Sequence, residues 1–317
     1  MLYYTYHKQG RDVIMLTWKK TVAFGLVLVQ LGLGSAFAAA PDLSGLVVRE
    51  PGTFWRLDAA NKPEVPRNYR VDESLRMSGS AQPSVLALTA MLHDLHKRGV
   101  TPQQLVLVDL RQEDHGFFNG TAVSWYGKDN WGNVGRSEAW ITKDEEKRLT
   151  AAEEKNMTYY DLGKKKVPVP AGTTYVAIAP TEEQLASIMG IGYKRFPSTD
   201  HIWPAASEID QFLAWSQTLP KDAWLHFHCE AGVGRTTAFM TIWDIWHNVQ
   251  KDSLESICAR ETALGGQDIL HLTSKNKTKE LENADKQYHL RQFYEYAKAY
   301  QSGQTQEPWS AYLQQHS

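Results

Sequence analysis

Hydrophobic positions along the chain follow two patterns, one helical and one continuous. From Ser84 to Arg98 the apolar residues recur every three or four positions, which predicts an amphipathic helix. Residues 105–110 and 224–228 are nearly continuous apolar runs of strand length, as expected of strands buried on both faces. A helical pattern from about Arg235 to Gln250 follows the second run. This alternation predicts an α/β fold with a central, mostly parallel sheet flanked by helices.

The middle of the chain has a different pattern. A charged run from Lys143 to Lys155 precedes two short candidate strands, near residues 158–162 and 174–178. A helix is predicted from Thr181, where Gln184 completes a capping-box pattern. We interpret this part as a small β-rich subdomain inserted into the core fold. The predicted domains are residues 39–118 with 196–317 for the core and residues 119–195 for the insertion.

Further helices are predicted in the second half of the chain. Ser207 and Asp210 have the spacing of a capping box, which predicts a helix from there toward Leu219. An aromatic-rich helical pattern covers residues 284–300. Cys258 follows an apolar position in another helical segment, which predicts a buried and inert thiol.

The N-terminal segment is predicted to direct export rather than to fold. Two lysines precede the apolar run Thr21–Leu33, and small residues follow it, as in a secretory signal peptide. The residues before Met15 fit this pattern badly, so we place the true start at Met15. The predicted signal peptide is residues 1–38, with cleavage after Ala38 or Ala40, which implies an exported protein, periplasmic or secreted. The alternative is an uncleaved anchor; no later apolar run has membrane length, so no membrane contact is expected after cleavage.

Composition and net charge limit which classes of ligand the protein is expected to bind. Shares of 42% hydrophobic and 22% charged residues are typical of a globular protein rather than a disordered one. The formal net charge of −2 provides no general basic field, so no nucleic-acid partner is expected and an anion must be bound locally. With only two cysteines, Cys229 and Cys258, at most one disulfide can form. A free reactive thiol in an oxidising compartment invites a functional explanation.

The segment from His228 to Thr237, HCEAGVGRTT, lies between the second apolar strand and the helix that follows it. A strand, a glycine-containing loop and a helix N-terminus together point backbone N–H groups at a bound anion. Gly232 and Gly234 allow backbone angles and close approaches that side chains would prevent. The loop residues predicted to bind the anion are Glu230, Ala231, Gly232, Val233 and Gly234.

Three side chains of this loop supply chemistry. Cys229 lies where the helix dipole, the N–H groups and Arg235 all favour thiolate, the reactive form of cysteine. The guanidinium of Arg235 can hold two phosphoryl oxygens at once and follow them into the transition state. Thr236 can donate a hydrogen bond to the sulfur when it becomes the leaving group. The alternative is a buried structural cysteine, but then the strand, glycines, arginine and hydroxyl would coincide by chance.

This segment resembles a known family. Cysteine, five residues, arginine and threonine, preceded by histidine, are similar to the signature of the protein tyrosine phosphatase superfamily. The version HCEAGVGRTT most resembles the bacterial tyrosine-phosphatase-like inositol phosphatases, the cysteine phytases. The resemblance covers roughly residues 65–300 and implies a tyrosine-phosphatase-like core with a small β-rich subdomain. Other segments similar to that family are residues 68–70, 78–82, 109–113, 124–127 and 181–184.

The resemblance also implies a general acid. In these phytases an Asp-His-x-x-Pro segment carries the acid, and residues 199–204 read TDHIWP. This implies Asp200 as the acid and His201 as a contact to substrate phosphate. A carboxylic acid can protonate the leaving oxygen and, as carboxylate, then accept a proton from attacking water. Because Asp200 must be protonated while Cys229 is ionised, the highest rate is expected on the acid side of neutrality. The alternative is that Asp200 only caps the following helix.

A ligand with several phosphates needs several cationic side chains around one pocket. The alternative for any one lysine is that it is simply solvated at the surface. The cationic residues predicted to bind substrate are Arg70, Lys166, Lys277 and Lys279.

The chain departs from the family pattern at two places. Asn130, beside Asp129, occupies a position where an acidic residue is expected. The spacing of Lys275, Lys277, Lys279 and Lys286 matches the family only approximately.

The remaining polar residues near these motifs are given supporting roles. Arg111 and Glu113 are interpreted as a structural pair that braces the site. His228 is expected to orient the loop, because no second ligand cluster with metal-site spacing is evident, and no metal is predicted.

The leading hypothesis is a cysteine-dependent phosphatase that removes phosphates stepwise from myo-inositol hexakisphosphate through a phosphocysteine. The same residues could instead serve a protein tyrosine or phosphoinositide phosphatase. A non-catalytic binder of phosphorylated ligands is a third possibility, although nucleophile, arginine and acid are all present. The expected partner is a small polyphosphorylated inositol, and no cofactor is expected.

Overall fold

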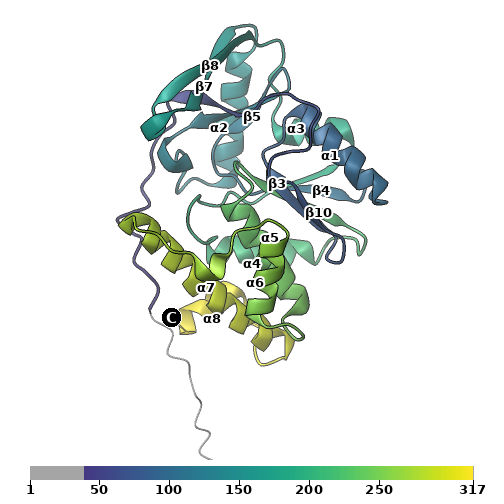
Figure 1. Ribbon diagram of the computed structural model, residues 1–317, viewed down its shortest axis with the longest axis vertical. Helices are drawn as coiled ribbons and strands as arrows, with labels where there is room; N and C mark the ends of the chain where they lie inside the picture. The colour runs from purple at the N-terminus through teal and green to yellow at the C-terminus, as the bar shows by residue number, and fades with distance from the viewer. Residues whose placement is uncertain (1–38, 317) are drawn as a thin grey trace, which may run out of the picture. The chain divides into compact units, whose positions relative to one another are not determined.

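Two five-stranded sheets organise residues 39–316, the part of the chain that the computed structural model describes (Figure 1). The predicted signal peptide, residues 1–38, lies outside this part. Within it, no helix is both long enough and apolar enough to cross a membrane. The sheets and the helices packed on them form a mixed α/β fold, as the sequence pattern predicts.

One sheet, the core sheet, contains both of the predicted apolar strands. Its strand order is β2-β3-β10-β4-β9; β2 is antiparallel to β3, and all other neighbours are parallel. β10 lies at the centre and is buried throughout, which explains its continuous apolar sequence. The core-sheet strands are β2 (Arg70–Asp72), β3 (Met77–Ala81), β4 (Leu105–Asp109), β9 (Gly192–Arg195) and β10 (Trp224–Cys229).

Helices cover both faces of the core sheet (Figure 1). α1 and α3 pack on one face through a cluster that includes Leu88 and Leu107. The C-terminal helices pack on the other face through a cluster that includes Phe227 and Phe239. The helices are α1 (Val85–Lys97), α3 (Glu182–Met189), α4 (Ala206–Ser216), α5 (Gly234–Asn248), α6 (Leu254–Ala263), α7 (Lys277–Gln301) and α8 (Trp309–His316).

The second sheet has the order β5-β6-β1-β7-β8, and its only parallel pair is β1 with β7. Helix α2 packs on it, where Leu149 meets Trp55 and Val123 in one apolar cluster. Its elements are β1 (Phe54–Ala59), β5 (His115–Phe118), β6 (Thr121–Tyr126), β7 (Asn156–Leu162), β8 (Pro168–Tyr175) and α2 (Glu138–Ala152). Three short 3₁₀ helices complete the described elements: η1 (Lys128–Asn130), η2 (Lys164–Lys166) and η3 (Ile269–His271).

The expected insertion, residues 119–195, coincides with only part of the second sheet. Strands β1 and β5 precede that range, yet both pair with β6. Strand β9 lies inside the range but pairs in parallel with β4 of the core sheet. Strand pairing joins residues that are distant in sequence, and the local alternation of side chains does not specify the partner strand.

Helix starts were predicted with mixed success. The capping box of Thr181 and Gln184 is confirmed, with both reciprocal hydrogen bonds present. The box predicted at Ser207 is wrong, because α4 already begins at Ala206. Glu208 then occupies the third helical position, and its carboxylate accepts from the free N–H at the helix start.

Candidate active site

The loop of residues 230–234, predicted to bind an anion and here called the phosphate loop, begins where β10 ends. Cys229, the last residue of β10, lies opposite Ala81 of β3. Gly232 has φ +72°, and a Cβ there would lie 2.3 Å from the backbone nitrogen of Ala81, so only glycine fits. Gly234 starts α5 beside open space, so its predicted need for glycine is not supported. Among the described residues, no acceptor is bound by the N–H groups of residues 230–233, which leaves these donors available beside the N-terminus of α5.

Asn68 and Arg70 brace this loop. Asn68 Nδ2 donates to the Ala231 carbonyl at 2.7 Å. The buried guanidinium of Arg70 donates to the Gly232 carbonyl at 2.8 Å and to Thr237 Oγ1 at 3.2 Å. These contacts make Arg70 a brace of the loop, while its Nε has no hydrogen-bond partner among the described residues, so the prediction that Arg70 binds substrate stays a prediction.

The two cysteines have different surroundings. Thr236 Oγ1 donates a hydrogen bond to Cys229 Sγ at 3.2 Å, the contact that suits a thiolate. Cys258 is buried in α6, as predicted, and burial raises the pKa of its thiol to about 12. The structure therefore gives only Cys229 a neighbouring donor that stabilises negative charge on sulfur.

Arg235 is fixed by a buried carboxylate. Its Nη1 and Nη2 donate to Glu113 Oε2 and Oε1 at 2.8 and 3.0 Å. Burial opposes ionisation of Glu113, but Arg235 and Arg111 hold the pKa of that carboxyl well below its usual value. Glu113 is therefore a permanent anion that sets the plane of the Arg235 guanidinium.

Asp200 approaches Arg235 from the loop that precedes α4. Its Oδ2 accepts from Asn130 Nδ2 at 2.7 Å and lies 3.3 Å from Arg235 Nη2. Trp131 Nε1 donates to the Asp200 carbonyl at 3.1 Å. Burial alone would raise the pKa of Asp200, but the charge of Arg235 and the hydrogen bond from Asn130 hold it below its usual value. Asp200 does not cap α4, whose N-cap residue is Ala205.

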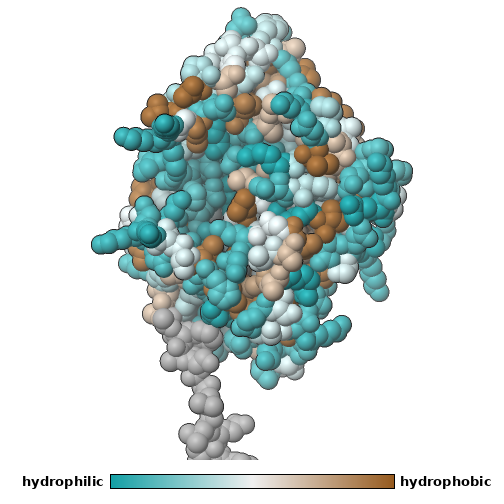
Figure 2. Space-filling model, in the orientation of Figure 1, coloured by the Kyte–Doolittle hydropathy of each residue, from teal (hydrophilic) through white to brown (hydrophobic). Residues whose placement is uncertain are grey.

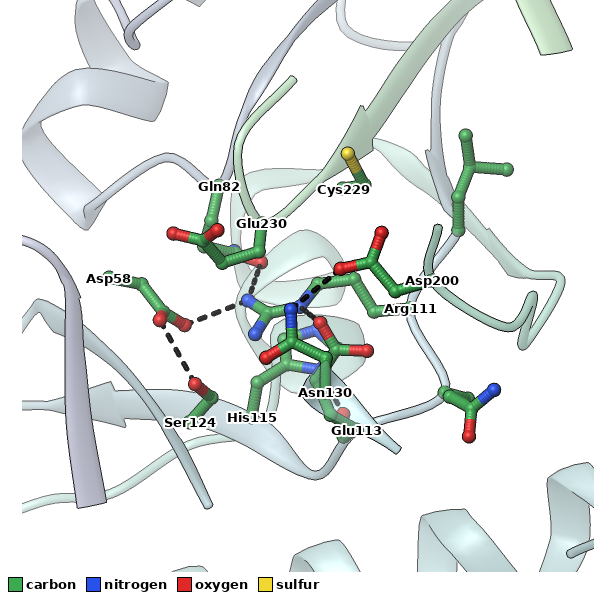
Figure 3. A network of polar contacts seen from close by, with 12 residues as sticks. Asp58, Gln82, Arg111, Glu113, His115, Ser124, Asn130, Asp200, Cys229 and Glu230 are labelled. Carbon is green, nitrogen blue, oxygen red and sulfur yellow. Dashed lines mark hydrogen bonds and ion pairs between the residues drawn. The ribbon is translucent and has the colours of Figure 1, made fainter. Parts of the chain in front are cut away.

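Buried polar contacts close into a ring around these residues, which we call the charge ring. Asp58 Oδ1 accepts from Arg56 Nη2 at 2.7 Å, and Asp58 Oδ2 accepts from Arg111 Nη1 at 2.8 Å. Arg111 Nε donates to Glu113 at 2.9 Å, so the predicted bracing pair is present (Figure 3). Removing one partner of such a buried pair typically costs about 3–5 kcal/mol. In order, the charge ring is Arg56, Asp58, Arg111, Glu113, Arg235, Asp200 and Asn130.

Two predicted phosphate-binding residues meet at Asp129. Lys166 forms an ion pair with Asp129, and His201 Nε2 lies 4.0 Å from the same carboxylate. All three have left-handed backbone angles, with φ of 56° at Asp129, 58° at Lys166 and 74° at His201. Such angles are uncommon outside glycine and cluster at functional sites. Lys166 and His201 thus lie together beside the Asp200 loop.

The lysines of α7 differ in position. Lys277 and Lys279 are exposed on its first turn. Lys286 is buried further along the helix; burial lowers its pKa, while its charge acts on Asp200. Lys286 therefore lies near Asp200, although the spacing of the lysines in the sequence did not distinguish it from its neighbours.

Glu230 lies at the mouth of the phosphate loop among arginines. Its Oε1 is 3.3 Å from Arg67 Nη2 and 3.5 Å from Arg56 Nη2. All three residues line a cavity of about 470 Å³ beside the loop. The face of the protein seen in Figure 2 is mainly hydrophilic and is hollowed.

A second buried cluster lies next to the loop. His228 Nε2 is 3.0 Å from Glu182 Oε2, and with Asp109 these residues offer ligand atoms within 4.8 Å of one another. Asp109 Oδ2 already accepts from Tyr193 at 2.8 Å and lies 3.1 Å from Arg195 Nε. The positive charge of Arg195 would repel a metal ion bound at this cluster.

Sequence reasoning missed part of the site. Asn130 was noted only as a departure from the family, and Arg56 was not singled out. Arg56 and Asp58 alternate along β1, so they share a face of the strand. Two opposite charges on one face of a short strand are a signal that could have drawn attention to β1.

A family model supports the interpretation of these residues. The model for PTP-like phytases, described as inositol hexakisphosphate, matches residues 108–247. That range includes Asn130, Asp200, Cys229 and Arg235. A curated relative, the effector protein hopD2 of Pseudomonas syringae pv. tomato, is 28% identical over 206 residues, which are 63% of this chain and 44% of that protein.

Solved structures are similar in fold. The PTP-like myo-inositol phosphatase from Mitsuokella multacida, in complex with myo-inositol-(1,3,4,5)-tetrakisphosphate, is 36% identical with a TM-score of 0.78, covering 87% of this chain and 50% of its own. The tandemly repeated PTP-like phytase of the same organism is 37% identical with the same TM-score and the same coverage. The chain therefore spans about half the length of these relatives.

A third structure matches almost end to end. The PTP-like phytase from Bdellovibrio bacteriovorus is 32% identical with a TM-score of 0.70. The match covers 87% of this chain and 98% of that one. On this likeness, and with Cys229, Arg235 and Asp200 gathered at one place, the chain belongs to the PTP-like phytase family.

Proposed function

We propose that the chain is a cysteine-dependent phosphatase that removes phosphates one at a time from myo-inositol hexakisphosphate. The observation that carries the proposal is the meeting of three groups at the end of β10. Cys229 accepts a hydrogen bond from Thr236, Arg235 is held by Glu113, and Asp200 faces Arg235. Nucleophile, anion clamp and proton donor are the parts that phosphoryl transfer requires.

The first step is attack by the Cys229 thiolate on phosphorus. A sulfur–phosphorus bond forms while the phosphorus–oxygen bond to the inositol breaks, and Asp200 gives its proton to the departing oxygen. Arg235 and the loop N–H groups stabilise the equatorial oxygens throughout. In the second step Asp200, now a carboxylate, takes a proton from water that attacks the phosphocysteine. Thr236 stabilises the sulfur as it leaves.

The low pKa of Asp200 has to be reconciled with its proposed role as an acid. Arg235 is the main group that favours its ionised form against burial. A phosphate dianion held by Arg235 would offset that charge, so substrate binding is expected to raise the pKa of Asp200. Leaving-group protonation then operates on the acid side of neutrality, as the sequence predicts.

The choice of an inositol polyphosphate rests on the charges around the loop. Lys166, His201 and Lys286 lie near Asp200, beyond the residues that a single phosphate needs. The Mitsuokella phosphatase is solved with an inositol tetrakisphosphate. Because there is one phosphate loop, phosphates are expected to leave singly.

The substrate is tested by comparing kcat/KM for inositol hexakisphosphate with that for a phosphotyrosine peptide, followed by product analysis over time. We expect the higher value for the inositol phosphate and the successive appearance of lower inositol phosphates. A marked preference for the peptide would contradict the substrate but not the chemistry. Cys229→Ser serves as the blank for both substrates.

Replacing Asp200 with asparagine is expected to lower kcat for inositol hexakisphosphate by about 10²-fold or more, because the alkoxide then leaves without a proton. Release of nitrophenolate from p-nitrophenyl phosphate, which needs no proton, should slow much less in its first step. Asp222→Asn, an exposed aspartate before β10, is the matched control. Equal slowing of this first step on both substrates, measured before the steady state, would count against Asp200 as the acid.

We also propose that the chain is exported, on the pattern of residues 1–38 alone. Fractionation of bacteria that express the full chain checks this proposal. Retention of an uncleaved chain in the membrane fraction would favour the anchor instead.

A further inference from the structure

We propose that Asn130, oriented by Arg56, is a positioning residue that sets the upper pH limit of leaving-group protonation by Asp200. The inference rests on the proposed function, because it takes Asp200 to be the acid. It extends that function by assigning a role to the one position of the site where the chain departs from the expected acidic residue.

The orientation of the Asn130 amide is determined by its two partners. Asn130 Oδ1 accepts from Arg56 Nη1 at 3.2 Å, and Asn130 Nδ2 donates to Asp200 Oδ2 at 2.7 Å. A guanidinium only donates hydrogen bonds, so the oxygen of the amide must face Arg56. The NH₂ group is therefore held toward Asp200, and Asn130 acts there only as a donor.

Arg56 is itself held rigidly. Its Nε and Nη2 donate to Asp58 Oδ1 at 2.9 and 2.7 Å, and its guanidinium lies 5.2 Å from the centre of the Tyr126 ring. Both Arg56 and Asp58 are buried. With Nε and Nη2 both bound to Asp58, the plane of the guanidinium is fixed, and its Nη1 points at Asn130.

The backbone also fixes Asn130. Its φ is 62°, in the left-handed region, which asparagine tolerates better than most residues. Its N–H donates to the Gly127 carbonyl at 3.0 Å, and only 6% of its surface is exposed. The backbone of Asn130 is therefore held by Gly127 and its side-chain oxygen by Arg56, both independently of Asp200, as a positioning role requires.

A fixed donor at this point favours the ionised acid. A hydrogen bond to a carboxylate stabilises the charged form, whereas a second carboxylate at the same place would have to share a proton with it. An aspartate at position 130 would therefore keep Asp200 protonated to higher pH. The other charged groups that face Asp200 are Arg235 of α5, Glu113 after β4, His201 of its own loop, Lys166 of η2 and Lys286 of α7.

The test is the pH dependence of kcat/KM for the full chain and for Asn130→Asp. With inositol hexakisphosphate, kcat/KM falls at high pH as Asp200 loses its proton; we call this fall the basic limb of the profile. In Asn130→Asp we expect the basic limb to shift to higher pH by about one unit. With p-nitrophenyl phosphate, whose leaving group needs no proton, the limb should stay in place. The ionisation of each substrate is common to both proteins and cancels from the comparison.

A second pair of variants separates positioning from folding. Asn130→Ser keeps a short hydrogen-bonding side chain at this position, and Arg56→Lys keeps the positive charge but loses the fork that orients the amide. Thermal unfolding is measured for each variant before its profile. A basic limb that stays in place in a folded Asn130→Asp, or an equal loss of rate at every pH, would overturn the inference.

Failure of this inference and failure of the proposed function give different results. If Asp200→Asn removes hydrolysis of inositol hexakisphosphate while Asn130→Asp leaves the limb unmoved, only the role of Asn130 is wrong. If Asp200→Asn has no effect, the assignment of the acid is wrong. In the double variant Asn130→Asp with Asp200→Asn, no upward movement of the limb is expected.

Discussion

Replacing Cys229 with serine is expected to lower kcat for inositol hexakisphosphate by about 10⁴-fold or more. A hydroxyl is far harder to ionise than a thiol. Among the described residues, no general base contacts the side chain of residue 229, and Thr236 alone donates a hydrogen bond to it. The loop N–H groups and Arg235 are unchanged, so ligand binding should persist. Steady-state kinetics measures the first effect, and calorimetry with inositol hexakisphosphate measures the second.

The chain offers its own control for this substitution. Cys258 is also a buried, free thiol, but it lies in α6 and the pKa of its thiol is raised by burial to about 12. Cys258→Ser should leave kcat within about twofold. Substantial activity in Cys229→Ser, or a comparable loss in Cys258→Ser, would contradict the assignment of the nucleophile.

Arg235→Lys is expected to lower kcat by about 10³-fold although the positive charge is kept. The guanidinium makes two hydrogen bonds to Glu113 and still presents a planar edge toward Asp200 and the loop. A lysine cannot bind Glu113 and two phosphoryl oxygens in one plane. The loss should therefore fall mainly on kcat, because the clamp acts on the transition state.

The control for the arginine is Arg260→Lys. Arg260 also makes two hydrogen bonds to one carboxylate, that of Asp244, but the pair joins α5 and α6 away from the phosphate loop. Its replacement should affect stability rather than kcat. A fully active and folded Arg235→Lys would show that charge alone, without the planar fork, is sufficient.

The sequence predicted most locally encoded features well, although not the helix start at Ser207. The strand that ends at Cys229, the loop and α5 are contiguous, so a single apolar run and its glycines reveal them. The capping box at Thr181 was predictable for the same reason. Asp200, the proposed acid, was singled out through resemblance to a family, since no local pattern shows that it lies near the loop in space.

Contacts between distant residues were not predictable in this way. Asn130 and Asp200 are 70 positions apart, and Arg111 and Asp58 are 53 apart. The charge ring depends on strand β1 of the second sheet facing loops of the core sheet, which no alternation pattern specifies. Arg70 is a further example, because no local pattern in its motif indicated the hydrogen bond by which it braces the loop.

The most direct test of the central claim is rapid-quench analysis of Asp200→Asn with p-nitrophenyl phosphate. In the proposed mechanism, formation of the covalent intermediate needs no acid with this substrate, whereas hydrolysis of that intermediate needs Asp200 as base. We therefore predict a burst of nitrophenolate equal to the enzyme concentration, with one phosphoryl group on the peptide that contains Cys229. Turnover without a burst, or a phosphoryl group on any other residue, would contradict Cys229 as the nucleophile.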